Sequence, residues 1–228
     1  MSELLVWFIR HAESESNAGL AIKDTALTSL TPKGIEQARR LAQVFLGPPS
    51  LVVTSVYRRS QETAQATVER FPGVRQEVWP VHEFTYLARF RGQLTTLQQR
   101  KPTAEAYWRR CDPFYRGGEG AESFADLVQR IQATLERLRQ QEQGFVAVFG
   151  HGAFMRVMFW VLFTGSFEVN AERMRQFSAI GPLFTVPNTA MIKLRFNSEG
   201  LWFSQIISAH LADRAAHAQH DVETLEAE

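Results

Sequence analysis

Apolar and polar residues follow one another along the chain in blocks that predict alternating strands and helices. Residues 4–9 form a continuous apolar run with the length of a strand buried on both faces. A helical pattern follows at 31–45, then a second short apolar run at 51–53 and another helix at about 58–70. This alternation predicts a parallel sheet covered by helices on both faces.

The following part of the chain extends the same pattern. Residues 78–84 are expected to form a third extended segment, and residues 122–141 a long amphipathic helix. Residues 145–149 predict another buried strand, followed by a helix at about 153–163. The apolar face of the long helix is expected to consist of Phe124, Leu127, Val128, Ile131, Leu135 and Leu138.

Residues 87–115 do not follow the alternation. This segment is rich in arginine, glutamine and aromatic residues, is helical in parts, and is expected to be broken by Pro102 and Pro113. We interpret it as a lid-like insertion that packs over one end of the sheet. Specificity is expected to lie in this insertion, in the cations and flat aromatic surfaces of Arg89, Arg91, Arg100, Tyr107, Trp108 and Arg109.

The end of the chain predicts a hairpin and a tail. Residues 191–196 and 202–207 are two strand-like runs around the turn residues Asn-Ser-Glu-Gly. We therefore expect one domain over residues 1–211 that contains the insertion, and a flexible tail at 212–228.

Composition restricts the classes of function. The chain has 45% hydrophobic residues, 25 basic and 24 acidic residues and a formal charge of +1, so no overall field favours nucleic acid or a membrane surface. Cys111 is the only cysteine, which excludes an internal disulfide and a thiolate metal cluster. No signal peptide and no apolar run of about 20 residues is found, so a cytoplasmic protein is expected.

Polar side chains stand at the ends of the predicted strands. Arg10 and His11 follow the first strand, Arg58 follows the second, Glu83 ends the third extended segment, and His151 follows the strand at 145–149. Ligands of open parallel sheets bind just outside the carboxyl ends of the strands, so we expect these residues to share one pocket.

These residue types suit phosphoryl transfer. Arginines grip two phosphate oxygens at once, and a neutral imidazole such as His11 attacks phosphorus near pH 7. Glu83 could protonate the leaving alkoxide, and arginines with a second imidazole could stabilise the transition state without a metal. Each residue also has a structural alternative: Arg58 could pair with Glu62 on its own helix, Glu83 could be a surface carboxylate, and a single strand-end histidine is more often structural.

Several motifs together resemble the histidine phosphatase superfamily, also called the phosphoglycerate mutase-like family. Residues 10–17 read Arg-His-Ala-Glu-Ser-Glu-Ser-Asn, and residues 30–38 contain a Leu-Thr-x-x-Gly-x-x-Gln-Ala helix start. Residues 55–64 match the family's Ser-x-x-x-Arg-x-x-Gln-Thr-Ala stretch with one extra residue before the threonine. Glu-Ser-Phe at 122–124 and Gly-His-Gly at 150–152 follow in the family's order.

The resemblance implies a fold and a mechanism. The fold is a three-layer α/β/α sandwich around a mostly parallel sheet with one antiparallel strand, which the terminal hairpin would supply. His11 would be phosphorylated and then released by water, with Glu83 as general acid and later as base. The residues that would hold the phosphoryl oxygens are Arg10, Asn17, Arg58 and His151. The implied partners are a small phosphomonoester and inorganic phosphate, with no cofactor and no metal.

Departures from the motifs favour hydrolysis over mutase chemistry. Ala12 replaces the usual glycine, as in phosphatase members. Ser16 precedes Asn17 where mutase-type members have tryptophan, their Gly-Trp segment is missing, and no glycine follows Glu83.

Other readings stay open. They are a mutase-type transfer, a non-catalytic relative that binds a phosphorylated ligand, and a metal hydrolase. The only close histidine pair, His217 and His220, lies in the tail, where a solvated stretch is the simpler interpretation. The substrate is also open, because a sugar phosphate, a nucleotide or a phosphoprotein could each use the insertion.

Overall fold

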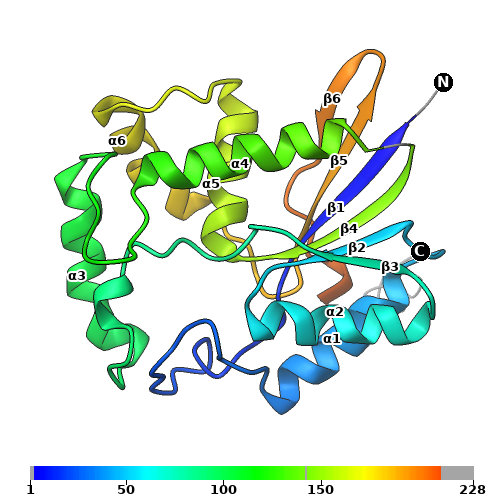
Figure 1. Ribbon diagram of the computed structural model, residues 1–228, viewed down its shortest axis with the longest axis horizontal. Helices are drawn as coiled ribbons and strands as arrows, with labels where there is room; N and C mark the ends of the chain where they lie inside the picture. The colour runs from blue at the N-terminus through cyan, green and yellow to red at the C-terminus, as the bar shows by residue number, and fades with distance from the viewer. Residues whose placement is uncertain (1–2, 142, 212–228) are drawn as a thin grey trace, which may run out of the picture.

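A single mixed sheet forms the centre of the computed structural model, which describes residues 3–141 and 143–211 (Figure 1). Within these residues the strand order is β3-β2-β4-β1-β5-β6. The strands are β1 (Leu4–Arg10), β2 (Leu51–Thr54), β3 (Arg75–Val78), β4 (Gly144–Gly150), β5 (Met191–Asn197) and β6 (Gly200–Phe203). The pairs among β1 to β4 are parallel, and β5 pairs antiparallel with both of its neighbours. The expected antiparallel strand is therefore β5, from the terminal hairpin.

Helices cover both faces of the sheet. Helices α1 (Pro32–Val44) and α2 (Arg58–Arg70) lie on one face, and α4 (Phe124–Arg139) and α5 (Gly152–Thr164) lie on the other (Figure 1). The predicted three-layer α/β/α sandwich is confirmed.

Side chains alternate along β1 between the two cores. Val6 and Phe8 are fully buried in the core that includes Leu127 of α4. Ile9 is buried in the second core together with Leu41 of α1. Both faces of β1 are thus apolar, which explains why its sequence is a continuous hydrophobic run.

Helix α4 begins two residues later than the sequence predicts. Ser123 is its N-cap: the Ser123 hydroxyl accepts from the Asp126 backbone N–H at 3.2 Å, and the Asp126 carboxylate accepts from the Ser123 N–H at 2.8 Å. This capping box defines the first turn. The six apolar residues predicted for its inner face are all buried: Phe124, Leu127, Val128, Ile131, Leu135 and Leu138.

The third strand lies earlier than predicted. The expected extended segment was 78–84, whereas β3 spans 75–78 and is an exposed edge strand paired only with β2. The backbone N–H of Trp79 still donates to the Thr54 carbonyl at 2.9 Å, and the next residue, Pro80, has no N–H to continue the ladder. Glu83 is therefore carried by an irregular segment and not by a strand end.

The 87–115 segment contains the 3₁₀ helix η1 (Ala88–Phe90) and α3 (Leu97–Arg110). The expectation that Pro102 breaks it was wrong, because α3 runs through that residue. Thr96 and Gln99 form a capping box that starts the helix, and Trp108 packs against Phe177 with ring centroids 5.5 Å apart. These contacts offset the one backbone hydrogen bond that proline removes.

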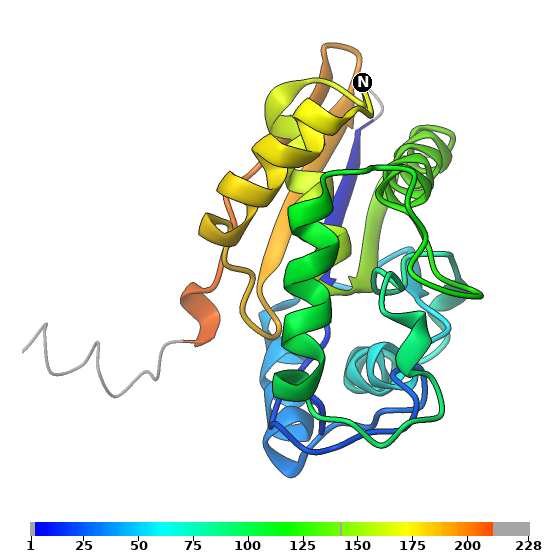
Figure 2. The ribbon, with the colours of Figure 1, turned by 90° about the vertical axis from the view of Figure 1, so that its left-hand side faces the viewer.

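Helix α6 (Ala171–Ile180), which the sequence did not predict, packs beside α3 (Figure 2). The 3₁₀ helix η2 (Gly181–Leu183) follows α6, and η3 (Ala209–Leu211) ends the described chain. The predicted tail at 212–228, with its histidine pair, lies outside the described residues. In the part of the chain that is described, no helix has the length and apolar character needed to cross a membrane.

The close surroundings of Gly34 explain why the Leu-Thr-x-x-Gly motif has a glycine at this position. A Cβ at Gly34 would lie 2.0 Å from the carbonyl oxygen of Glu13, in the loop that carries the first motif. The same first turn is fixed by Thr31, whose hydroxyl accepts from the Gly34 N–H at 3.0 Å. Helix α1 therefore approaches the motif loop more closely than any side chain allows.

We expect Gly34→Ala to lower the free energy of unfolding by about 1–3 kcal/mol, because the backbone must move to relieve the contact. Urea unfolding measures this change. Gly47→Ala is the matched control, since nothing lies within 4 Å of a Cβ there, and a change within about 0.5 kcal/mol is expected. Equal losses in the two variants would contradict the close approach.

Candidate active site

His11 follows β1 and is held in one tautomer. Its backbone N–H donates to the Gly150 carbonyl at 3.0 Å, so the residue continues the β1–β4 pairing. The ring Nδ1 lies 2.7 Å from the Ala12 carbonyl, which can only accept. Nδ1 therefore carries the proton, and the lone pair is on Nε2.

Arg59 joins the two histidines of the site. Its Nε donates to Nε2 of His11 at 3.0 Å, and one Nη donates to Nδ1 of His151 at 3.0 Å. The other Nη donates to the Thr25 carbonyl. The side chain is 5% exposed, and it lies over the Tyr57 ring with 4.9 Å to the ring centroid.

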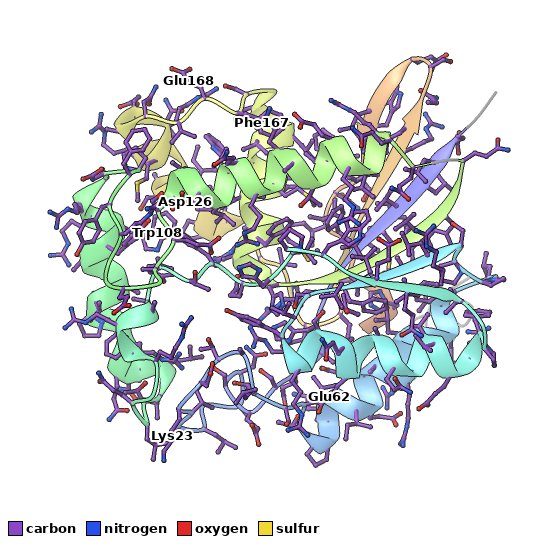
Figure 3. The ribbon with its side chains drawn as sticks, viewed as in Figure 1. Lys23, Glu62, Trp108, Asp126, Phe167 and Glu168 are labelled. Atoms are coloured by element: carbon purple, nitrogen blue, oxygen red, sulfur yellow. The ribbon has the colours of Figure 1, made fainter. Side chains whose placement is uncertain are left out.

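The structure does not place Arg58 in this site, in contrast to the sequence prediction. Arg58 is exposed, and its Nε pairs with Glu62 at 2.8 Å, one turn further along α2 (Figure 3). Successive helical residues point about 100° apart, so only one of two adjacent arginines can face the sheet. Counted from Ser55, the family's Ser-x-x-x-Arg spacing ends at Arg59 with no extra residue, and this was the signal in the sequence.

Arg10 contributes a second buried guanidinium. One Nη donates to the Val186 carbonyl at 2.6 Å, while the buried Nε has no hydrogen-bond partner among the described residues. Burial lowers the pKa of Arg10, whereas the nearby Glu83 carboxylate raises it. A buried guanidinium N–H without an acceptor is costly, so this atom is suited to an anionic ligand.

His151 follows β4 and is completely buried. Since the guanidinium of Arg59 can only donate, Nδ1 of His151 accepts, and its Nε2–H donates to the Ser55 hydroxyl at 2.7 Å. Its ring centroid is 5.0 Å from that of His11. Burial and the charge of Arg59 lower the pKa of His151 well below the ordinary value. His151 is thus neutral in the free enzyme.

Glu83 lies at the N-terminus of α5. Its Oε1 accepts from the backbone N–H of Ala153 at 2.9 Å and from its own neighbour Phe84 at 3.1 Å. The carboxylate is close enough to Arg10 and Arg59 to raise the pKa of each against the effect of burial. The carboxyl group and the two arginines therefore border the same space.

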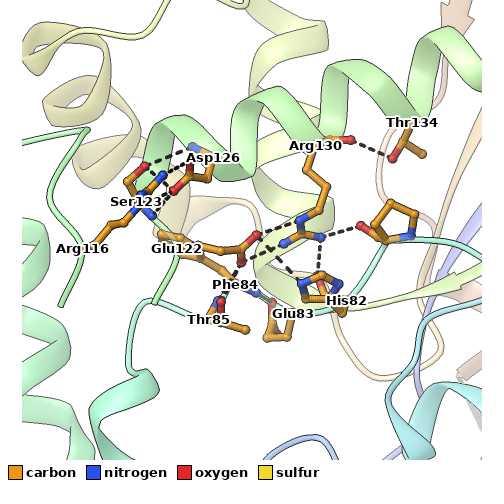
Figure 4. Close-up of polar contacts among 11 residues, drawn as sticks. His82, Glu83, Phe84, Thr85, Arg116, Glu122, Ser123, Asp126, Arg130 and Thr134 are labelled. Atoms are coloured by element: carbon orange, nitrogen blue, oxygen red, sulfur yellow. Dashed lines mark hydrogen bonds and ion pairs between the residues drawn. The ribbon is translucent and has the colours of Figure 1, made fainter. Parts of the chain in front are cut away.

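A polar cluster holds the irregular segment that carries Glu83 (Figure 4). Glu122 accepts from the backbone and the hydroxyl of Thr85, both at 3.0 Å, and pairs with Arg130 at 2.8 Å. Arg130 also donates to the carbonyls of Pro80 and His82 at 2.7 and 2.8 Å. These contacts give Glu122, which lies in the Glu-Ser-Phe motif, a positioning role that sequence reasoning did not identify.

Asn17 is oriented by three donors. Its Oδ1 accepts from the Ser14 backbone N–H and hydroxyl and from Asn188, at 3.3, 3.1 and 3.1 Å. Asn188 also donates to the His11 carbonyl at 2.9 Å. The amide NH₂ of Asn17 is therefore the group that can donate to a ligand.

Burial and positive charge decide the protonation of the site. The pKa of His11 is lowered well below its ordinary value by burial, Arg59 and Arg10. Burial also lowers the pKa of Arg59 to about 10, which leaves it charged. A neutral imidazole with its lone pair on Nε2, beside two charged guanidinium groups, is suited to attack an anionic phosphoryl group.

Comparison with known proteins identifies the family of the chain. The profile described as histidine phosphatase superfamily (branch 1) matches residues 6–206. The chain belongs to the histidine phosphatase superfamily. The family that the motifs suggested is thus confirmed.

Two curated relatives are similar to this chain in sequence. Human 6-phosphofructo-2-kinase/fructose-2,6-bisphosphatase 4 is 32% identical over 166 residues, covering 67% of this chain and 31% of the relative. The chain therefore spans about a third of that relative's length. The adenosylcobalamin/alpha-ribazole phosphatase of Escherichia coli is 28% identical over 145 residues, covering 60% of this chain and 69% of the relative.

Solved structures share the fold of this chain. A phosphoserine phosphatase mutant from Entamoeba histolytica, in complex with phosphoserine, has a TM-score of 0.69 and 20% identity, and covers 92% of this chain and 100% of that one. A mycobacterial glucosyl-3-phosphoglycerate phosphatase has a TM-score of 0.64 and 22% identity, over 89% and 96% of the two chains. The name of each of these relatives and neighbours includes a phosphatase, which is a hydrolase, in agreement with the enzyme class expected from the sequence.

Most of the candidate residues line a cavity of about 290 Å³, whereas His151 contacts Arg59 and is not among the lining residues. Arg10, His11, Asn17, Arg59 and Glu83 line its inner part. The other walls come from the 14–25 loop, whose Lys23 is labelled in Figure 3, and from the 87–115 insertion. Ile22 and Thr95 join these two segments through paired backbone hydrogen bonds of 3.0 and 3.1 Å.

Proposed function

We propose that this chain is a metal-independent phosphomonoester hydrolase that works through a phosphohistidine on His11. The observation that carries the proposal is the Nδ1–H donation of His11 to Ala12, which leaves the Nε2 lone pair beside Arg59 in the cavity. Glu83 acts as general acid and then as general base.

In the first step the phosphoryl group binds between the arginines. A phosphate dianion is a stronger acceptor for guanidinium than an imidazole nitrogen is, so it takes over the Arg59 donor and releases the Nε2 lone pair. Nε2 attacks phosphorus and the P–O ester bond breaks. The leaving alkoxide takes its proton from the carboxyl group of Glu83.

In the second step water attacks the phosphorus of the phosphohistidine. The Glu83 carboxylate accepts a proton from this water, the P–N bond breaks, and inorganic phosphate leaves with His11 restored. Backbone N–H groups hold Oε1 of Glu83, so the same carboxyl group stays in place for both steps.

The phosphoryl oxygens are held by Arg10, Asn17, Arg59 and His151, and Arg59 takes the role first expected for Arg58. The guanidinium group of Arg10 and the NH₂ of Asn17 donate from the cavity wall. When the phosphate engages Arg59, Nδ1 of His151 becomes available. The charge of the dianion favours the charged ring, so His151, neutral in the free enzyme, takes up a proton from solvent on Nδ1 and donates from it to the phosphoryl group.

The size of the cavity favours a small substrate. A cavity of about 290 Å³ is of the size that fits a metabolite. Relatives named for phosphoserine, alpha-ribazole and fructose 2,6-bisphosphate support a small phosphorylated molecule as the substrate class.

The test is hydrolysis of p-nitrophenyl phosphate and of a phosphomonoester panel, with rapid quench of a ³²P-labelled substrate. We expect a base-stable, acid-labile label on His11 and activity that survives EDTA. Label on serine or aspartate, or loss of activity with EDTA, would overturn the mechanism. Transfer of the label to a second hydroxyl instead of water would identify a mutase, and absence of any turnover would identify a phospho-ligand-binding protein.

A further inference from the structure

The loop at 186–190, just before β5, lies against the residues that follow β1. One Nη of Arg10 donates to the Val186 carbonyl at 2.6 Å, and the backbone N–H of Arg10 donates to the Ala190 carbonyl at 2.9 Å. The backbone N–H of Thr189 donates in return to the Arg10 carbonyl at 3.0 Å. These contacts fix the loop beside the first motif.

Thr189 gives this loop a fixed backbone shape. It is fully buried and has a φ of +61°, in the left-handed region that β-branched residues rarely adopt. Its hydroxyl donates to the Asn188 carbonyl at 2.7 Å, and the N–H of Ala190 donates to the Pro187 carbonyl at 3.0 Å. Such conformations persist only where the surrounding contacts hold them, and they cluster at functional sites. The turn therefore holds the side chain of Asn188 in one direction.

The side chain of Asn188 joins two residues of the proposed site. Its Nδ2 donates to the His11 carbonyl at 2.9 Å and to Oδ1 of Asn17 at 3.1 Å, so both of its amide hydrogens are used. Asn188 is not among the residues that line the cavity, whereas His11 and Asn17 are. It can therefore act on a bound phosphate only through these two residues.

Asn188 decides which end of the Asn17 amide faces the cavity. Oδ1 of Asn17 also accepts from the backbone N–H and the hydroxyl of Ser14, at 3.3 and 3.1 Å. The Ser14 hydroxyl can accept as well as donate and the N–H contact is long, so neither fixes the amide as strictly as the NH₂ of Asn188, which can only donate. A reversed Asn17 amide would present an oxygen to the phosphoryl group, where a donor is needed.

We propose that Asn188 is a positioning residue, which directs the NH₂ of Asn17 toward the phosphoryl group and holds the backbone of His11 where Nε2 can attack. This inference rests on the proposed function, because it concerns the groups that bind and attack the phosphoryl group. Misplacement of such groups by about 1 Å can lower the rate by about 10²-fold. We therefore expect Asn188→Ala to lower kcat/KM for p-nitrophenyl phosphate by about 10- to 100-fold.

A double-mutant cycle of Asn17→Ala and Asn188→Ala tests the route of this effect. If Asn188 acts through Asn17, its removal has a smaller effect once the Asn17 side chain is absent. We expect the loss of kcat/KM in the double variant to be smaller than the product of the two single losses by about fivefold or more. A purely structural role of Asn188 would not produce this coupling, so single losses that multiply in the double variant would overturn the inference.

Asn188→Asp tests the direction of the hydrogen bonds at nearly constant side-chain size. An ionised aspartate has only acceptors, and here it would face two oxygens, the His11 carbonyl and Oδ1 of Asn17. The Asn17 amide is then expected to reverse. We expect kcat/KM to fall below that of Asn188→Ala by about tenfold. An aspartate variant as active as the alanine variant would show that donation by Asn188 is not what matters.

Asn197→Ala is the matched control. Asn197 ends β5 at the turn to β6, where its Oδ1 accepts from the Glu199 N–H at 3.0 Å, and it is not among the residues that line the cavity. We expect its kcat/KM to stay within about twofold of the wild type, and its effect to multiply with that of Asn17→Ala. Circular dichroism melting checks the folding of each variant. If Asn188→Ala does not fold, Asn188→Ser, which keeps one donor, takes its place in the cycle.

Inorganic phosphate distinguishes failure of this inference from failure of the proposed function. Hydrolysis that depends on His11, with single losses that multiply in the cycle, overturns the role of Asn188 and leaves the hydrolase intact. If the wild type hydrolyses nothing but binds inorganic phosphate in calorimetry, the hydrolase is overturned, and the same coupling in phosphate affinity supports the role of Asn188 while its absence overturns it. A wild type that neither hydrolyses phosphomonoesters nor binds phosphate overturns both.

Discussion

Replacement of His11 by alanine is expected to lower kcat for p-nitrophenyl phosphate by about 10⁴-fold or more and to abolish the phosphoenzyme. Nε2 of His11 carries a lone pair beside Arg59, and His11 lines the cavity. Water would then have to attack directly, without the covalent step. Stopped assays of phosphate release, together with rapid quench, measure both effects.

A second histidine serves as control for this prediction. His210 contacts the Thr189 carbonyl at 3.0 Å and does not line the cavity, so His210→Ala is expected to keep kcat within about threefold of the wild type. Activity retained in His11→Ala, or a phosphoenzyme that persists in it, would show that another group is the nucleophile.

Replacement of Arg59 by alanine is expected to lower kcat/KM by about 10³-fold, whereas the same change at Arg58 should leave it within about twofold. Arg59 is buried and donates to His11, His151 and a backbone carbonyl, so the proposed site loses its central phosphate ligand. Arg58 is exposed and has only its surface pair with Glu62. Two adjacent residues of one helix thus give a strict comparison.

Arg59→Lys separates charge from geometry. A lysine keeps the positive charge but has no planar fork, so it cannot hold two phosphoryl oxygens while it stays near both histidines. We expect a loss of about 10²-fold in kcat/KM, measured on variants whose thermal unfolding has been checked. Equal effects of alanine at positions 58 and 59 would show that the arrangement around Arg59 does not form in the working enzyme.

The position of Glu83 depends on contacts far away in the sequence. Arg130 and Glu122, from α4 and the residue before its N-cap, hold the backbone of the 80–85 segment. This cluster is buried enough that its hydrogen bonds are not replaced easily by water. Glu83 is proposed to protonate the leaving alkoxide and then to accept a proton from water. Rigid support keeps its carboxyl group in place for both steps.

Periodicity and motif spacing in the sequence determined the fold class. The continuous apolar runs of β1 and β4 and the apolar stripe of α4 are local patterns, and each corresponds to a buried surface in the structure. The same patterns located His11 and His151 at strand ends, where parallel strands bring distant residues together. The local sequence pattern is sufficient to predict these features. The spacing of apolar residues within one strand or helix decides which of its faces is buried.

Tertiary structure alone decided which side chains meet. The motif spacing counted from Ser55 indicates Arg59, but Arg58 and Arg59 are equivalent by type, and the rotation of α2 against the sheet is what turns Arg59 toward the histidines. Glu83 reaches the site on an irregular segment held by α4, and Arg100 of α3 is buried beside the cavity. The tautomer of His11 likewise depends on a carbonyl whose direction follows from the loop. Orientation, burial and hydrogen-bond partners arise from contacts between distant segments, and for this reason the sequence predicted the chemistry of the site but not the complete set of residues that form it.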